Sequence, residues 1–297
     1  MILTPFAAHG FHCLIPETWE LQVFKGPWQG GHLVFVDHRT PTLALTWERT
    51  GRNPDFSRTL RVVAKRLERD IDARLVRTDP IPGRMGSMAR FAANGGEFVV
   101  AMLVPDPEQN LVIVLRQLTP GAPRDLYQAM ESLHVYPSDA AIPWRFHGLA
   151  LDLPPWWRLH SSQLMVGMAR AVWFHRPHNC VKTHAVLVMR RYACASRLLD
   201  EGDVGAWLTQ RLSHDEMIDT QQTDSDGTVQ MRVLGPGSSL WRRLWRKHET
   251  RHLAVWVDDP ADRLVVQEWK GLGRPLPPLR SCHNLKDRAL PQQEDAR

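Results

Sequence analysis

A short motif built around proline and tryptophan occurs twice in this chain, and it constrains the fold more than any other feature. The first copy spans residues 14–21 (LIPETWEL) and the second spans residues 152–159 (DLPPWWRL). Each copy reads as an apolar residue, proline, two residues, tryptophan, a charged residue and leucine. The tryptophans are 138 positions apart (157 − 19), close to half of the 297 residues. This spacing predicts a tandem duplication of one structural unit.

The order of the predicted elements repeats in the same way. Alternating apolar residues predict strands. Apolar residues at helical spacing predict a helix over 56–71 in the first half and, in the second half, a helix for which Asp203 is the expected N-cap. In the first half, a last helix is predicted to begin at Pro123. The predicted strands lie at 11–15, 19–23, 32–36, 42–47, 73–77, 88–92, 97–104 and 110–117, and then at 146–153, 171–174 and 184–189. Residues 257–265 are predicted to form the last β-hairpin of the second half.

These patterns predict an α+β fold with two tandem units, each a twisted antiparallel sheet flanked by helices. The first unit is expected to span residues 1–138 and the second residues 142–286, with a polar C-terminal tail at 287–297. Each unit has enough residues to bury a core of its own.

A strand, Pro-x-x-Trp, a β-hairpin, a helix, antiparallel strands and a terminal helix together resemble the Mog1/PsbP-like fold. Its members include PsbP, Mog1, LpqN-type lipoproteins and DUF1795 proteins, among them chaperones for type VI secretion effectors. The resemblance implies a protein that binds partners and does not catalyse a reaction. Only Pro16, Trp19, Pro154 and Trp157 match the shared pattern, and a structural role is expected for them. The chain departs from some members because it shows no lipobox and no transit peptide.

Charge and hydropathy narrow the classes of partner and compartment. The formal net charge of +5 is small for this length, so an anionic partner is permitted but not required. No secretory signal is evident, and the apolar runs are shorter than the ~20 residues of a membrane helix. The sequence therefore predicts a cytoplasmic protein, in which four cysteines without a CxxC pair are free thiols.

Two segments could carry binding chemistry. Residues 175–184 hold four side chains of the types that Zn²⁺ prefers, His175, His178, Cys180 and His184, although their spacing fits no standard zinc module. The alternative is a polar hairpin tip with scattered histidines.

Residues 240–252 interleave basic and aromatic side chains, a composition that suits an anionic partner or membrane surface. The candidate binding residues are Trp241, Arg242, Arg243, Trp245, Arg246 and Lys247. The competing interpretation is a strand pair whose arginines are simply solvated.

The sequence holds no Walker A, HExxH or GxSxG motif, and we expect no catalytic residues. The first functional hypothesis is a non-enzymatic adaptor or chaperone-like module with a protein partner and no cofactor. The alternative is a zinc-dependent enzyme or hydrolase that uses the 175–184 loop.

Overall fold

The structure is a computed structural model that divides into two compact units, Met1–His147 and Gly148–Asn284. It describes residues 2–50, 61–62, 65, 69, 72–94, 96–106, 108–120, 124–137, 140–154, 156–175, 185–199, 203–236, 248–258 and 261–271. Strand β11 (Ile142–Phe146), which was expected to open the second unit, belongs to the first.

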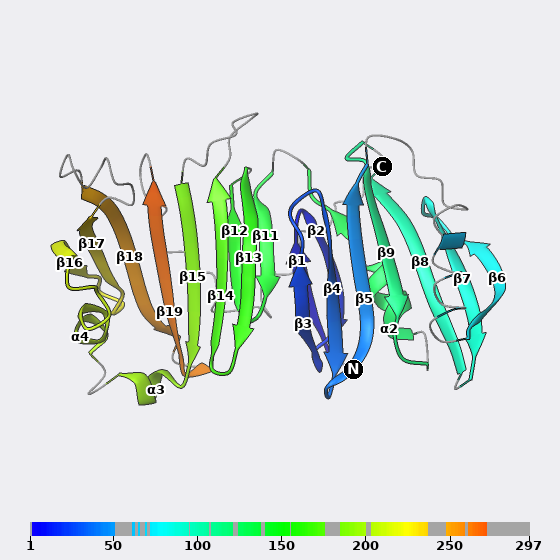
Figure 1. Ribbon diagram of the computed structural model, residues 1–297, viewed down its shortest axis with the longest axis horizontal. Helices are drawn as coiled ribbons and strands as arrows, with labels where there is room; N and C mark the ends of the chain where they lie inside the picture. The colour runs from blue at the N-terminus through cyan, green and yellow to red at the C-terminus, as the bar shows by residue number, and fades with distance from the viewer. Residues whose placement is uncertain are drawn as a thin grey trace. The chain divides into compact units, whose positions relative to one another are not determined.

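Unit 1 is built on a seven-stranded antiparallel sheet with the order β3-β4-β5-β9-β8-β7-β6 (Figure 1). Its long apolar runs favour strands that are buried on both faces, as the burial of β8 shows, whereas β3 alternates between buried and exposed positions. The strands are β3 (Trp19–Lys25), β4 (Gly30–Asp37), β5 (Thr40–Arg49), β6 (Arg74–Pro80), β7 (Gly86–Ala93), β8 (Gly96–Asp106) and β9 (Leu111–Gln117).

A second layer covers one face of this sheet. It contains β1 (Leu3–Ala8), β2 (Phe11–Pro16), β10 (His134–Val135) and β11 in the order β10-β2-β1-β11, together with α2 (Arg124–Glu131). Phe6 of β1 packs edge-on against Phe35 of β4, with ring centroids 5.1 Å apart, and both side chains are fully buried. One core of unit 1 therefore lies between these two layers, and a second buried cluster, which includes Phe98, Val100 and Met102 of β8, lies on the opposite face of the sheet.

Unit 2 repeats this sheet, with the order β13-β14-β15-β19-β18-β17-β16. Its elements are β12 (Leu149–Leu153), β13 (Trp157–Met165), β14 (Met168–His175), β15 (Ala185–Ala193), α3 (Ala195–Leu198), α4 (Val204–Thr209), β16 (Met217–Thr223), β17 (Val229–Pro236), β18 (His248–Asp258) and β19 (Arg263–Gly271). The two seven-stranded sheets thus share one strand order, which a tandem duplication requires.

The motif residues occupy matching positions in the two sheets. Trp19 opens β3 and pairs with Asp37, the last residue of β4, while Trp157 opens β13 and pairs with His175, the last residue of β14. Both indoles are buried. Pro16 ends β2 and Pro154 follows β12, where a missing backbone N–H costs no ladder hydrogen bond.

The predicted α+β class is wrong. The described residues are mostly in strands of three antiparallel sheets, and α2, α3 and α4 have only eight, four and six residues. The helical spacing after Asp203 was recognised, but the helix ends at Thr209, too short to flank a sheet of seven strands. The predicted helix at 56–71 lies outside the described residues, except for four positions that are helical, Arg61, Val62, Lys65 and Arg69.

The predicted strand at 146–153 is also wrong, because a turn divides it into β11 and β12. His147 and Gly148 both have positive φ, 51° and 67°, and His9 and Gly10 make the same turn between β1 and β2 with φ of 50° and 82°. Two successive positive φ values are typical of the hairpin turn that matches strand twist. In the part of the chain that is described, no helix is long and apolar enough to cross a membrane.

Candidate functional site

The basic segment predicted to bind anions is described only at its C-terminal end. Trp241, Arg242, Arg243, Trp245, Arg246 and Lys247 lie outside the described residues. Residues 248–252 begin β18, where Arg251 and His252 alternate between the two faces of the sheet. His252 packs against Trp269, with ring centroids 5.5 Å apart.

The predicted zinc ligands are likewise described at one position only. His178, Cys180 and His184 lie outside the described residues, and His175 ends β14 with its ring centroid 5.2 Å from that of Trp157. Within the described ranges, no three His, Cys, Asp or Glu side chains form a group suited to a metal ion. A zinc site in this loop stays a prediction.

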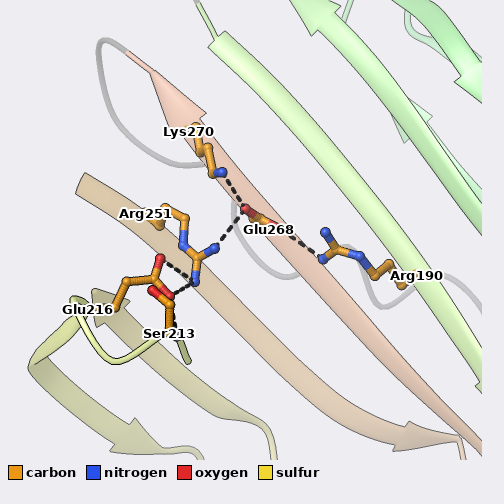
Figure 2. Close-up of polar contacts among 6 residues, drawn as sticks. All are labelled: Arg190, Ser213, Glu216, Arg251, Glu268 and Lys270. Atoms are coloured by element: carbon orange, nitrogen blue, oxygen red, sulfur yellow. Dashed lines mark hydrogen bonds and ion pairs between the residues drawn. The ribbon is translucent and has the colours of Figure 1, made fainter. Parts of the chain in front are cut away.

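A cluster of charged side chains on the sheet of unit 2 is the candidate site (Figure 2). At its centre, Glu268 of β19 is 3% exposed and accepts from three cations. Arg190 Nη1 lies 2.8 Å from Glu268 Oε2, and Lys270 Nζ lies 2.9 Å from Oε1. Arg251 Nη1 is 3.4 Å from Oε1, while its Nη2 lies 3.0 Å from Glu216 Oε1. We call these five residues the Glu268 cluster.

Sheet geometry brings these residues together. Arg190 pairs with Val266 across β15 and β19, and Arg251 pairs with Lys270 across β18 and β19, so all project from one face. Glu216 comes from the loop before β16, and the Ser213 backbone N–H donates to its Oε2 at 2.9 Å. This hydrogen bond orients the carboxylate that holds Arg251.

Opposing effects act on the pKa of Glu268. Burial raises it, because the charged form loses water, but the attraction of Arg190 and Lys270 lowers it by more. The net pKa lies below the usual glutamate value, so Glu268 is ionised at neutral pH. The cluster therefore holds three cations and two carboxylates, an excess of one positive charge.

The Glu268 cluster forms one end of a recess of about 290 Å³. Its other end is aromatic: Tyr192 and Trp207 meet edge to face at 5.5 Å, and the guanidinium of Arg211 lies 3.9 Å from the centroid of the Trp207 ring. The recess is lined by basic, aromatic and aliphatic side chains: Arg190, Tyr192, Trp207, Leu208, Arg211, Leu212, Arg251, Leu253, Val266 and Glu268. It thus combines an apolar floor with an excess of positive charge.

A buried hydrogen-bond donor also lines the recess. The Nε1–H of Trp207 has no acceptor among the described residues, and the side chain is 5% exposed. Buried polar groups are nearly always hydrogen-bonded, so an unpaired donor lining a recess calls for an explanation.

Unit 1 has the same sheet without this cluster. In unit 1, β8 and β9 pair Val100 with Arg116, and in unit 2, β18 and β19 pair Leu253 with Glu268. When these two pairs are taken as equivalent, Arg116 lies at the position of Glu268. The pairing of the neighbouring strands then places Phe98 at the position of Arg251 and Thr46 at that of Arg190. The seven-stranded sheet therefore forms without the Glu268 cluster.

Sequence reasoning missed Arg190, Arg211 and Glu268. One signal was present, namely a charged residue within the apolar strand β19. Glu268 lies two residues after Val266, so the two side chains face the same side of the sheet. A charged residue at such a position needs a partner. The sequence does not say which of the chain's 37 lysines and arginines supplies it.

No family model matches this chain, and no curated protein matches it. Among solved structures, it is similar to the immunity protein TplEi of the T6SS from Pseudomonas aeruginosa, determined in complex with "L" peptide. The two chains are 10% identical, the match covers 88% of this chain and 90% of that one, and the TM-score is 0.34.

Proposed function

We propose that this chain is a non-enzymatic binding protein that recognises a partner protein through the recess of unit 2. The recess takes an acidic side chain of the partner next to an apolar one. Arg190, Arg211 and Arg251 supply the positive charge, and Tyr192 and Trp207 supply the apolar contact. An adaptor or chaperone that holds another protein is the broader class.

The observation that carries this proposal is the difference between the two units. Unit 1 builds the same sheet with Phe98, Arg116 and Thr46 at the cluster positions. Burying Glu268 costs desolvation energy, which is offset only by well-placed partners. Because the fold does not require this arrangement, recognition of a ligand is the better reason for it.

We also propose that the two units arose by tandem duplication, as their shared strand order supports. The paired turns at His9–Gly10 and His147–Gly148 support it too, because they lie 138 positions apart (147 − 9), the same spacing as the tryptophans. After a duplication, one copy is free to keep the scaffold while the other acquires a binding site.

The proposal is tested with peptides selected from a random twelve-residue display library on the immobilised full-length chain. Selected peptides are labelled and titrated by fluorescence polarisation against wild-type protein and Arg211→Glu. Arg211 is exposed and lies outside the Glu268 cluster, so its reversal leaves the buried ion pairs intact. Charge-assisted contacts contribute about 1.5–3 kcal/mol, so affinity should fall at least about tenfold.

The matched control is Arg197→Glu, an exposed charge reversal on α3 of the same unit and outside the recess. Selected peptides should be enriched in Asp and Glu and should bind the control variant like the wild type. Peptides without acidic enrichment, or equal losses in the two variants, would refute the proposal.

A further inference from the structure

The hairpin between β13 and β14 exposes apolar side chains at its tip. Leu164 is 48% exposed, Met165 51% and Val166 106%, while Gly167, with φ of +75°, closes the turn. The corresponding hairpin of unit 1 folds its large side chain inward. There the Trp28 ring lies 3.9 Å below the guanidinium of Arg49, whose Nη1 donates to the Trp28 carbonyl at 2.9 Å. Exposure of the tip is therefore a property of unit 2.

The tip is continuous with the aromatic end of the recess. Met165 pairs with Met168 across β13 and β14, and Met168 pairs with Tyr192 across β14 and β15. Directly paired residues project from the same face of a sheet. An apolar row therefore crosses three neighbouring strands and ends at Trp207, which contacts Tyr192.

A second row, two residues further along the strands, is polar and basic. Gln163 pairs with Arg170, and Arg170 pairs with Arg190 of the Glu268 cluster. Arg170 is half-buried and makes no ion pair in the part of the chain that is described. Among the residues that the structure describes, the only carboxylate that forms an ion pair with this row is Glu268, which Lys270 and Arg251 also share.

The two rows lie side by side, so the face that contains them is apolar along one line and positive along the next. Neighbouring strands are about 4.8 Å apart, and the rows therefore extend about 10 Å from β13 to β15. An extended chain advances about 3.3 Å per residue, so this distance corresponds to about three residues of a bound segment. Side chains alternate along such a segment, which lets apolar and acidic residues meet different rows.

We infer that Met165, Met168, Arg170, Arg190, Tyr192 and Arg211 form one binding face for an extended segment of a partner protein in which apolar and acidic residues alternate. This inference rests on the proposed function, because the recess is one end of the face. Charge complementarity selects the acidic residues. The exposed Met165 and the partly buried Met168, whose flexible side chains adapt to varied shapes, take the apolar ones. The tip gives this partner an anchor beyond the recess.

The experiment uses the peptides selected on the full-length chain and titrates them against Met165→Ser/Met168→Ser and, separately, Arg170→Glu. Both variants should weaken binding at least about tenfold. Val76→Ser, which changes a 61% exposed apolar residue on β6 of unit 1, is the matched control and should bind like the wild type. Arg170→Glu provides an independent readout because it leaves the apolar tip unchanged.

The outcomes separate this inference from the function on which it rests. If Arg211→Glu weakens binding while the tip and Arg170 variants do not, the site is confined to the recess and this inference fails alone. If none of the variants weakens binding, both fail. Co-sedimentation with vesicles of phosphatidylcholine and phosphatidylserine is measured in parallel. Vesicle binding lost in the tip variant, with peptide binding unchanged, would assign the tip to a lipid surface and overturn the inference.

Discussion

Replacing Glu268 with glutamine should destabilise unit 2 strongly, although the side chains are nearly isosteric. The carboxylate is 3% exposed and lies 2.8 Å from Arg190 Nη1 and 2.9 Å from Lys270 Nζ. Hydrogen bonds to charged groups contribute about 1.5–3 kcal/mol each. Removing one member of a buried ion pair costs about 3–5 kcal/mol, because the remaining charges lose their partner.

Partial exposure of the cations reduces this cost. The side chains of Arg190 and Lys270 are 26% and 37% exposed, so water compensates them in part. Arg251 keeps its second partner, Glu216. We therefore expect Glu268→Gln to lower the free energy of unfolding by about 2–4 kcal/mol at pH 7.

The assay is urea unfolding combined with hydrogen exchange on peptides from β15 and β19, which assigns the loss to unit 2. Glu97→Gln is the control, because Glu97 is 46% exposed and pairs with Arg90 of unit 1 at 3.2 Å. Exposed pairs contribute about 0–1 kcal/mol. An effect of Glu268→Gln no larger than that of Glu97→Gln would refute the reasoning.

The same variant should show a defined dependence on pH. Since the pKa of Glu268 is lowered on folding, its stabilisation is complete above the usual glutamate pKa and is lost as the pH falls through the lowered value. The difference between wild type and Glu268→Gln should therefore shrink in acid. A difference that is constant down to the acid transition would contradict the ionic interpretation.

Two further predictions concern the scaffold. His12 is 8% exposed, and burial, followed by repulsion from His134, lowers its pKa to about 4. The stabilisation that comes from keeping His12 neutral in the folded state is complete above the unfolded pKa of about 6.5 and is lost as the pH falls toward 4. At about 1.36 kcal/mol per pKa unit, the loss is about 3 kcal/mol. Between pH 7.0 and pH 4.5, the free energy of unfolding measured in urea should therefore fall less for His12→Gln than for wild type. An equal fall in the two proteins would contradict this prediction. Trp157→Ala should cost about 3–5 kcal/mol, because it empties a buried indole site at the start of β13. A urea midpoint equal to that of the surface variant Arg197→Glu would show that Trp157 is not part of the core.

Local patterns in the sequence predicted many of the strands. Trp19, Leu21 and the alternating residues after them gave β3, and Asp203 was correctly placed as an N-cap, since its Oδ1 accepts from the Ala206 N–H at 2.9 Å. These predictions succeed because period-two burial and helix capping depend on residues that are close along the chain. A recurring His-Gly pair at 9–10 and 147–148, at the same spacing as the tryptophans, would have revealed the hairpin turns as well.

The predicted fold class failed for a related reason. Helical spacing identifies where a helix starts, but the length of α4 and the area it covers depend on how it packs on the sheet. Propensity is a weak prior that tertiary packing overrides. The sequence therefore indicated helices without showing that strands would make up most of both units.

The candidate site was decided by tertiary structure. Arg190 and Glu268 are 78 positions apart, and Arg251 and Glu268 are 17 apart, so no local pattern links them. They meet because β15, β19 and β18 are neighbours in a register that turns all three side chains to one face. A shift of one residue in either pairing would send a charged side chain to the opposite face. Local sequence patterns indicate many of the strands and the positions of the charged side chains, whereas strand order and register decide which of those charges meet.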